Sequence, residues 1–214
     1  MHIPQVAPEH YSRKYDAKDR WLAYWYQASL VLRTAPKNVI EIGGGNNTVR
    51  QMLQRAHIFM QTVDIDPALQ PDMVGSADAI PLPEDAADTV LCAEVLEHLP
   101  FDRFPVALAE LHRVAKKAVV LSLPHWGVTL RLCFKIPFLR ECDFFWKIPW
   151  PRRHIWNGEH YWEIGKTGFS PRRIRGSILA AGFTIAEERV FPDDPAHRFY
   201  LLGKRRTALP EGPL

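Results

Sequence analysis

The chain has few cysteines, little net charge and no long hydrophobic run, and each absence excludes a class of protein. Three cysteines cannot all pair, and Cys92, Cys133 and Cys142 follow no metal-ligand spacing. We expect reduced thiols and a cytoplasmic location, because disulfides are rare in the cytosol. A formal charge of +3 over 214 residues does not by itself indicate nucleic-acid binding.

No apolar run approaches the roughly 20 residues that a membrane-spanning helix needs. The sequence is polar from Gln5 to Arg20 and predicts no secretory signal peptide. Apolar residues make up 47% and charged residues 24% of the chain, which is ordinary for a globular protein. A chain of 214 residues is long enough for one domain with a sizeable core.

Short apolar runs alternate with helical patterns along most of the chain. Strands are predicted over residues 39–42, 59–63, 73–74, 89–93 and 118–123. Helices are predicted over residues 16–33, 48–56 and 105–115. This alternation indicates an α/β fold, a parallel sheet with helices on both faces. After Ser170-Pro171, a helix start, the pattern predicts a helix to Ala181 and then an antiparallel hairpin of residues 183–190 and 198–204.

A glycine-rich turn follows the first predicted strand. Glu41 precedes three consecutive glycines, Gly43, Gly44 and Gly45, and a helix begins near Thr48. Glycines allow positive φ and let a ligand approach the backbone closely. Because ligands of open α/β sheets bind at the carboxyl ends of the strands, this turn predicts a binding site.

Two further segments suit a nucleotide-like ligand. Asp64 ends the second predicted strand, 21 residues after Gly43, where a carboxylate can accept hydrogen bonds from ribose hydroxyls. Ser76, Ala77 and Asp78 follow the third strand and are candidates to hold the edge of an adenine ring.

The turn distinguishes between two such ligands. The dinucleotide fingerprint G-x-G-x-x-G would need a glycine where Thr48 stands. Glu41 would repel a pyrophosphate and attract a cationic group such as the amino group of a bound amino acid. These features favour S-adenosylmethionine. An NAD(P)-dependent oxidoreductase is the first alternative.

Residues 39–123 resemble the class I S-adenosylmethionine-dependent methyltransferases, in the broad group whose first motif is acidic-x-Gly-x-Gly-x-Gly. The matching segments are residues 41–47, 63–67, 75–83, 88–99 and 110–114. Asn47 replaces the last glycine of the first motif, and asparagine tolerates left-handed conformations better than most residues. Ser76 stands where the family usually has the aspartate that contacts adenine.

The resemblance implies a Rossmann-like sheet of seven mostly parallel strands, with the last strand antiparallel. It implies one methyltransferase domain over residues 1–207, with a cofactor-binding core at 16–123, a substrate cap inserted after strand five at 124–169, and a final helix and hairpin at 170–207. We expect residues 208–214 to be a disordered tail. The implied cofactor-binding residues are Glu41, Gly43, Gly44, Gly45, Asp64, Ile65, Ser76, Ala77, Asp78 and Glu94.

The predicted cap, residues 124–169, is too long for a simple connection. We expect one or two helices interrupted by Pro137, with the clustered tryptophans as the core of the cap and at least one lining the acceptor pocket. The alternative for residues 128–150, which mix apolar and basic residues, is contact with a membrane surface.

Methyl transfer needs a general base only when the acceptor is a hydroxyl or a protonated amine. The candidates are His125 after the fifth strand, His98 after the fourth, and His160 in the cap. Packing beside the cofactor is the other role for His98. His154, Glu159, His160 and Glu163 lie near one another in the sequence, but no cysteine or His-x-x-x-His pair supports a metal site, and we expect none.

The predicted activity is methyl transfer from S-adenosylmethionine to a small molecule, through a hydroxyl or amine of a sugar, glycolipid or aromatic metabolite. A nucleic-acid methyltransferase is a second alternative, although residues 93–96 read Ala-Glu-Val-Leu and not a base-flipping Asn/Asp-Pro-Pro-Tyr motif. A non-catalytic S-adenosylmethionine-binding module is the third.

Overall fold

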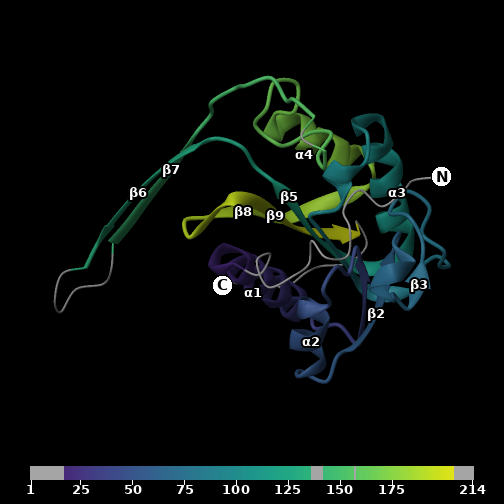
Figure 1. Cartoon of the computed structure of the whole chain (residues 1–214). Coiled ribbons are helices and arrows are strands. Elements are labelled where there is room, and N and C mark those ends of the chain that lie inside the picture. Colours follow the sequence, from purple (N-terminus) through teal and green to yellow (C-terminus); the bar gives the residue numbers. More distant parts are fainter. Residues whose placement is uncertain (1–16, 136–141, 157, 205–214) are drawn as a thin grey trace.

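The computed structural model describes residues 17–135, 142–156 and 158–204 (Figure 1). Its main sheet has seven strands in the order β3-β2-β1-β4-β5-β9-β8. The strands are β1 (Asn38–Ile42), β2 (Phe59–Asp64), β3 (Met73–Val74), β4 (Ala87–Ala93), β5 (Ala115–Pro124), β8 (Phe183–Phe191) and β9 (Asp194–Lys204). β1 to β5 pair in parallel, and β9 is antiparallel to both of its neighbours. The predicted seven-stranded α/β fold with an antiparallel last strand is confirmed.

Helices cover both faces of the sheet, as the alternating pattern predicts (Figure 1). They are α1 (Lys18–Arg33), α2 (Thr48–Gln54), α3 (Phe104–Val114) and α4 (Pro171–Ala180), with short 3-10 helices η2 (Pro67–Leu69), η3 (Leu96–His98) and η4 (Phe101–Arg103). Side chains alternate between the faces along β1: Val39 packs in the cluster of α1 and α2, and Ile40 and Ile42 pack in the cluster of α3 and α4. Each face therefore has its own hydrophobic core.

Strand register brings four loops to one edge of the sheet. Ile42 at the end of β1 lies beside Val63 of β2 and Cys92 of β4, and Ala93 lies beside Ser122 of β5. The residues that follow these strands are therefore neighbours in space, although the sequence separates them widely.

The prediction of one or two helices in the cap, residues 124–169, is wrong. β6 (Val128–Phe134) and β7 (Cys142–Ile148) form a separate two-stranded antiparallel hairpin, called the arm below, which extends away from the main sheet (Figure 1). Apolar residues recur at every second position from Val128 to Phe134, with polar or small residues between them. That period of two is typical of a strand, and a helix would scatter these side chains around its axis.

The second half of the insertion packs against the main domain. Trp162 is fully buried against Phe101 and Phe104, and its Nε1 donates to the carbonyl of Leu99 at 3.1 Å. Of the five tryptophans in this segment Trp162 alone is buried, and it belongs to the core of the main domain, so the predicted tryptophan core of the cap is wrong. The other four are at the surface: Trp126, Trp146, Trp150 and Trp156.

No helix in the described residues is long and apolar enough to cross a membrane. The predicted disordered tail, residues 208–214, lies outside the described residues, as does Pro137. The division of residues 1–207 into core, cap and final hairpin stays a prediction.

Candidate functional site

The turn after β1 has a conformation that glycine adopts most easily. Gly43 and Gly45 have φ values of 77° and 49°, and a Cβ on Gly43 would lie 2.3 Å from Cγ2 of Val95. Asn47 has a left-handed φ of 59°, as predicted for an asparagine in place of glycine. A Cβ on Gly44 would lie 3.1 Å from the Thr62 side chain. The turn therefore exposes backbone that side chains would otherwise cover.

Glu41 is a buried carboxylate beside this turn. Its side chain is on β1, the residue is 5% exposed, and Oε2 has no hydrogen-bond partner among the described residues. Burial raises the pKa of this carboxyl to about 8; Arg50 acts against the rise and Asp64 adds to it. A buried acceptor without a donor is costly, so a cationic donor placed here would be strongly favoured.

Asp64 connects the end of β2 to the turn. Its Oδ1 accepts from the backbone N–H of Asp66 at 3.0 Å, and its Oδ2 accepts from that of Gly45 at 3.4 Å. Burial raises the pKa of Asp64, and these two N–H groups lower it in part. Ile65 follows directly and is partly buried. The structure thus places the predicted ribose-binding carboxylate next to the glycine turn.

A pocket opens beside the turn. It is lined by α1, the turn, the start of α2 and the end of β4, through Arg20, Tyr24, Gln27, Glu41, Gly43, Gly44, Gly45, Asn46, Thr48, Val49, Ala93 and Glu94. The three α1 residues were not predicted, because no local motif marks a helix that lies before the first strand. The hydroxyl of Tyr24 accepts from Nδ2 of Asn46 at 3.1 Å, which ties α1 to the turn.

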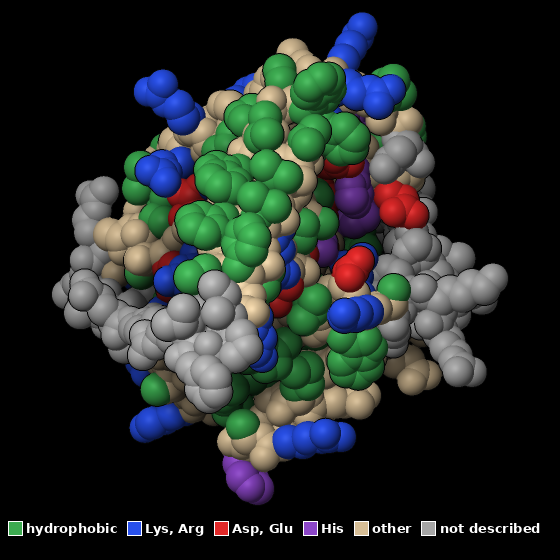
Figure 2. All heavy atoms as spheres, turned by 90° about the vertical axis from the view of Figure 1, so that its left-hand side faces the viewer, with side chains coloured by type: hydrophobic (Ala, Val, Ile, Leu, Met, Phe, Trp, Pro, Cys, Tyr) green, Lys and Arg blue, Asp and Glu red, His purple; other side chains and the backbone are tan. Residues whose placement is uncertain are grey.

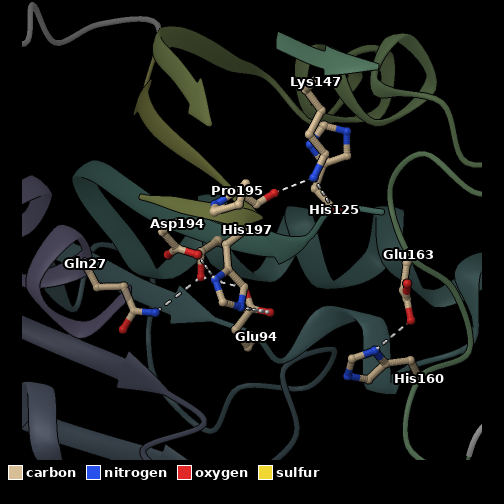
Figure 3. Close-up of polar contacts among 10 residues, drawn as sticks. Gln27, Glu94, His125, Lys147, His160, Glu163, Asp194, Pro195 and His197 are labelled. Atoms are coloured by element: carbon tan, nitrogen blue, oxygen red, sulfur yellow. Dashed lines mark hydrogen bonds and ion pairs between the residues drawn. The ribbon is translucent and has the colours of Figure 1, made fainter. Parts of the chain in front are cut away.

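Glu94 is at the edge of this pocket and belongs to a polar network (Figure 3). Its Oε1 accepts from the Ser122 hydroxyl at 2.9 Å, and its Oε2 lies 3.6 Å from Nε2 of His197. Nδ1 of His197 lies 2.6 Å from Oδ1 of Asp194. Burial lowers the pKa of His197, but Glu94 and Asp194 raise it more, so the net shift is upward. Sequence reasoning missed His197, which β9 brings to the site from the far end of the chain.

The segment after β3 is engaged in contacts of its own. The Ser76 hydroxyl donates to Oδ1 of Asp78 at 2.5 Å, and Arg103 forms an ion pair with Oδ2 of Asp78 at 2.7 Å. Ala77, which separates Ser76 and Asp78 in the sequence, is buried. The adenine-binding role of these three residues stays a prediction.

The structure brings His98 and His160 together. Their ring centroids are 5.0 Å apart in an edge-on arrangement, although 62 positions separate them in the sequence. Fully buried Glu97 contributes a carboxylate to the same cluster, and one ligand atom from each of the three residues lies within 4.8 Å of the others. Their predicted catalytic roles stay predictions.

His125 is in a different environment at the end of β5. Its Nδ1 accepts from Nε of Arg198 at 3.4 Å, and its carbonyl accepts from Nζ of Lys147 at 2.6 Å (Figure 3). Burial lowers its pKa to about 3, and the Arg198 and Lys147 charges contribute. An imidazole with that pKa is a weak base at neutral pH. The catalytic role of His125 stays a prediction, with the local electrostatics against it.

The fold and the turn after β1 agree with the resemblance to class I methyltransferases. A glycine turn after β1, an acidic residue ending β2 and an antiparallel seventh strand occur here in one sheet. Residues 40–123 match the family model described as a methyltransferase domain. The match covers 84 of the 214 residues, and together with the fold it supports an S-adenosylmethionine-dependent methyltransferase. No curated protein matches the chain.

Solved structures agree on the fold. The 1,6-didemethyltoxoflavin-N1-methyltransferase of Burkholderia thailandensis has a TM-score of 0.59 at 16% identity, over 95% of this chain and 93% of that one. The CcbJ methyltransferase of Streptomyces caelestis has a TM-score of 0.58 at 11% identity, over 89% and 98%. The glycopeptide N-methyltransferase MtfA, in complex with S-adenosylhomocysteine, has a TM-score of 0.57 at 11% identity, over 84% and 88%.

Proposed function

We propose that this protein transfers the methyl group of S-adenosylmethionine to a hydroxyl or amine of a small molecule, such as a sugar, a glycolipid or an aromatic metabolite. The observation that carries the proposal is the buried Glu41 carboxylate at the glycine turn, whose Oε2 has no hydrogen-bond partner among the described residues. The sulfonium cofactor carries an amino acid, and its ammonium group is the kind of donor that this oxygen lacks.

The other residues around the turn have matching roles in the proposal. Gly43, Gly44 and Gly45 allow the cofactor to approach the backbone, and Asp64 accepts hydrogen bonds from its ribose hydroxyls. In the proposal Ser76, Ala77 and Asp78 hold the edge of the adenine. S-adenosylmethionine supplies an activated methyl group, so the protein has only to position the acceptor and exclude water.

A hydroxyl or ammonium acceptor loses one proton as it is methylated. In the proposal Glu94 accepts it, because this carboxylate lines the pocket and contacts Ser122 and His197. His197 on β9 helps to position this carboxylate, with its Nε2 3.6 Å from Oε2 of Glu94. Glu94 thereby takes the base role in place of His125.

Two relatives in fold act on small acceptors by name, one on 1,6-didemethyltoxoflavin and one on a glycopeptide. The modest net charge of +3 also favours a small molecule over nucleic acid. We further propose a cytoplasmic location, because the three cysteines cannot all pair and Cys92 is buried in the core of the domain.

The test is transfer of labelled methyl groups from S-adenosylmethionine onto metabolites of a cell extract. We expect label in one or a few small products with the wild type and none above background with Asp64→Ala. Equal labelling by the two proteins, or none by either, would contradict the proposal. A cofactor-binding protein without turnover would bind S-adenosylmethionine in calorimetry and still leave every metabolite unlabelled.

A further inference from the structure

An unusual carboxylate lies next to the cofactor pocket. Glu97 in η3 is 0% exposed, and neither of its carboxylate oxygens has a hydrogen-bond partner in the described part of the chain. Burial raises the pKa of this carboxyl well above its usual range, and Glu94 adds to the rise. Buried carboxylates are normally hydrogen-bonded, paired with a cation or bound to a metal. Among the described residues Glu97 has neither a hydrogen-bond donor nor a paired cation at its carboxylate.

Two histidines complete a set of possible ligands. His98 is adjacent in η3, and His160 reaches the same place from the segment that packs over η3, where the N–H of Tyr161 donates to the carbonyl of Glu97 at 2.8 Å. One ligand atom from each of Glu97, His98 and His160 lies within 4.8 Å of the other two. Three ligand atoms at such short separations can bind a single ion after small side-chain rotations.

The outer contacts of both histidines are those expected of metal ligands. Nδ1 of His98 lies 3.0 Å from the carbonyl oxygen of Glu159, and Nδ1 of His160 lies 3.3 Å from Oε1 of Glu163. Each oxygen favours the tautomer with hydrogen on Nδ1 and the lone pair on Nε2. Metal-binding histidines in proteins are oriented in this way by a carbonyl or carboxylate.

We propose that Glu97, His98 and His160 form a site for one divalent cation of the Zn²⁺, Co²⁺ or Fe²⁺ type. Two imidazoles and one carboxylate match the ligand preference of these ions, whereas Mg²⁺ and Ca²⁺ prefer oxygen ligands throughout. Three protein ligands leave coordination positions open. The site revises the expectation of no metal: its members come from two distant segments, and His154 and Glu159 are not among its ligands.

The site lies near the cofactor pocket. Glu97 follows Glu94, a pocket residue, by three positions, and the Arg20 charge from the same pocket lowers the pKa of Glu97. An open coordination position would bind an acceptor hydroxyl and favour transfer of its proton to Glu94. Its oxygen would then form the new O–CH₃ bond while the S–CH₃ bond breaks and its electron pair stays on sulfur. This catalytic role rests on the proposed function, whereas metal binding does not.

The experiment measures metal binding first. Full-length protein is stripped with chelator and titrated with Zn²⁺ by calorimetry and with Co²⁺ by visible absorption. We expect one ion per chain and Co²⁺ bands of a site with nitrogen ligands. Glu97→Gln and His160→Ala should weaken binding by more than the roughly 10- to 100-fold that loss of an outer contact costs, and Glu163→Gln should fall within that range. Exposed Glu84→Gln and His57→Asn are the matched controls and should bind as the wild type does.

Several results would overturn the proposal. One is a wild type that binds no more tightly than Glu97→Gln, which would make Glu97 a neutral structural carboxyl. Another is equal loss of binding in the Glu84→Gln control. S-adenosylmethionine binding is measured on the same samples, and Glu97→Gln should retain it. Loss of cofactor binding by the wild type would count against the proposed function alone, and absence of metal binding would count against this site alone.

A second inference comes independently from the arm. Its cross-strand pairs Val128–Ile148, Leu130–Trp146, Leu132–Phe144 and Phe134–Cys142 put eight apolar side chains on one face. The seven large ones are 44–53% exposed, and hydrophobic side chains gather in this region in Figure 2. The opposite face carries an ion pair of Arg131 with Asp143 at 2.7 Å. A continuous apolar face of this kind marks an interaction surface.

We infer that this face binds the surface of an anionic phospholipid bilayer. The chain after β7 combines exposed Trp150 and Trp156 with exposed Arg152 and Arg153, and Lys135 is exposed beyond β6. Tryptophan favours the boundary between lipid and water, and cations near it are attracted to anionic headgroups. The inference gives the earlier alternative of membrane-surface contact a defined set of residues.

Sedimentation with vesicles tests this inference. Protein should sediment with phosphatidylcholine vesicles that contain phosphatidylglycerol, and less with phosphatidylcholine alone. Leu132→Glu should reduce binding at least tenfold, while Thr129→Glu, with the same charge on the opposite face, should reduce it far less. Equal effects of the two variants would contradict the apolar contact. A concentration-dependent dimer that Leu132→Glu abolishes, without vesicle binding, would instead assign the face to a second copy of the chain.

Discussion

β4 and the arm are both built from apolar strand residues, yet they have opposite environments. β4 pairs with β1 and β5 and lies between helices on both faces, so that Leu91 is 0% exposed. β6 pairs only with β7, and Leu132 is 44% exposed. Strand pairing and coverage, more than residue type, therefore decide which apolar residues stabilise the protein. The buried sheet supports the cofactor site, and the arm presents a surface.

The largest expected effect separates these two regions. Leu91→Ala should lower the free energy of unfolding by about 2–5 kcal/mol, because it leaves a cavity in the core. Leu132→Ala should change it by less than about 0.5 kcal/mol, because the side chain is already half in water. Urea unfolding followed by circular dichroism measures both. Similar losses in the two variants would mean that the arm is packed against the domain in solution.

The next effect concerns the buried carboxylate of the sheet. Glu41 has a pKa raised to about 8 by burial, so it is mostly protonated at pH 6, and its pairing with the cofactor ammonium requires loss of that proton. S-adenosylmethionine affinity should therefore rise about tenfold per pH unit from pH 6 to 7.5. Calorimetry across this range should show the rise in the wild type, and a flat profile in Glu41→Gln. A flat wild-type profile would remove Glu41 from ammonium binding.

The smallest expected effect is the contribution of His197 to the free energy of unfolding near neutral pH. The pKa of His197 is raised in the folded protein: burial lowers it, but Glu94 and Asp194 raise it more. The protonated imidazole therefore stabilises the fold below about pH 6.5, and this contribution is lost as the pH rises through the higher folded pKa. The effect should stay below the roughly 1.5–3 kcal/mol of a charged hydrogen bond. The stability difference between wild type and His197→Gln should shrink from pH 5.5 to 9, and a constant difference would assign His197 a purely packing role.

Much of the fold could be predicted because its signals are local. Each strand of the core is one short apolar run, and the start of α4 at Ser170-Pro171 and the stop near Gly182 are local capping features. The prediction of helices for the arm is wrong, because the alternation of apolar with basic residues over residues 128–150 is that of strands. The apolar face of this hairpin is exposed, so it also lacks the burial that marks the strands of the core.

The residues of the candidate site also fall into two groups: those that a local motif predicts and those that only the fold brings together. Glu41, the glycines and Asp64 belong to one motif and its neighbour in sequence, so the pattern was enough to find them. Arg20 and His197 reach the pocket region only through the order of strands and helices. Glu97 was missed as a site residue because its significance depends on His160, which lies 63 positions away in sequence.

Calorimetry with S-adenosylmethionine measures whether the glycine turn and Asp64 bind this cofactor. We expect one site per chain that S-adenosylhomocysteine also occupies. Asp64→Ala should weaken binding by about 100-fold or more, because hydrogen bonds to a charged partner contribute roughly 1.5–3 kcal/mol each. Binding of NAD without binding of S-adenosylmethionine, or unchanged affinity in Asp64→Ala, would contradict the assignment of the glycine turn and Asp64 as the cofactor site.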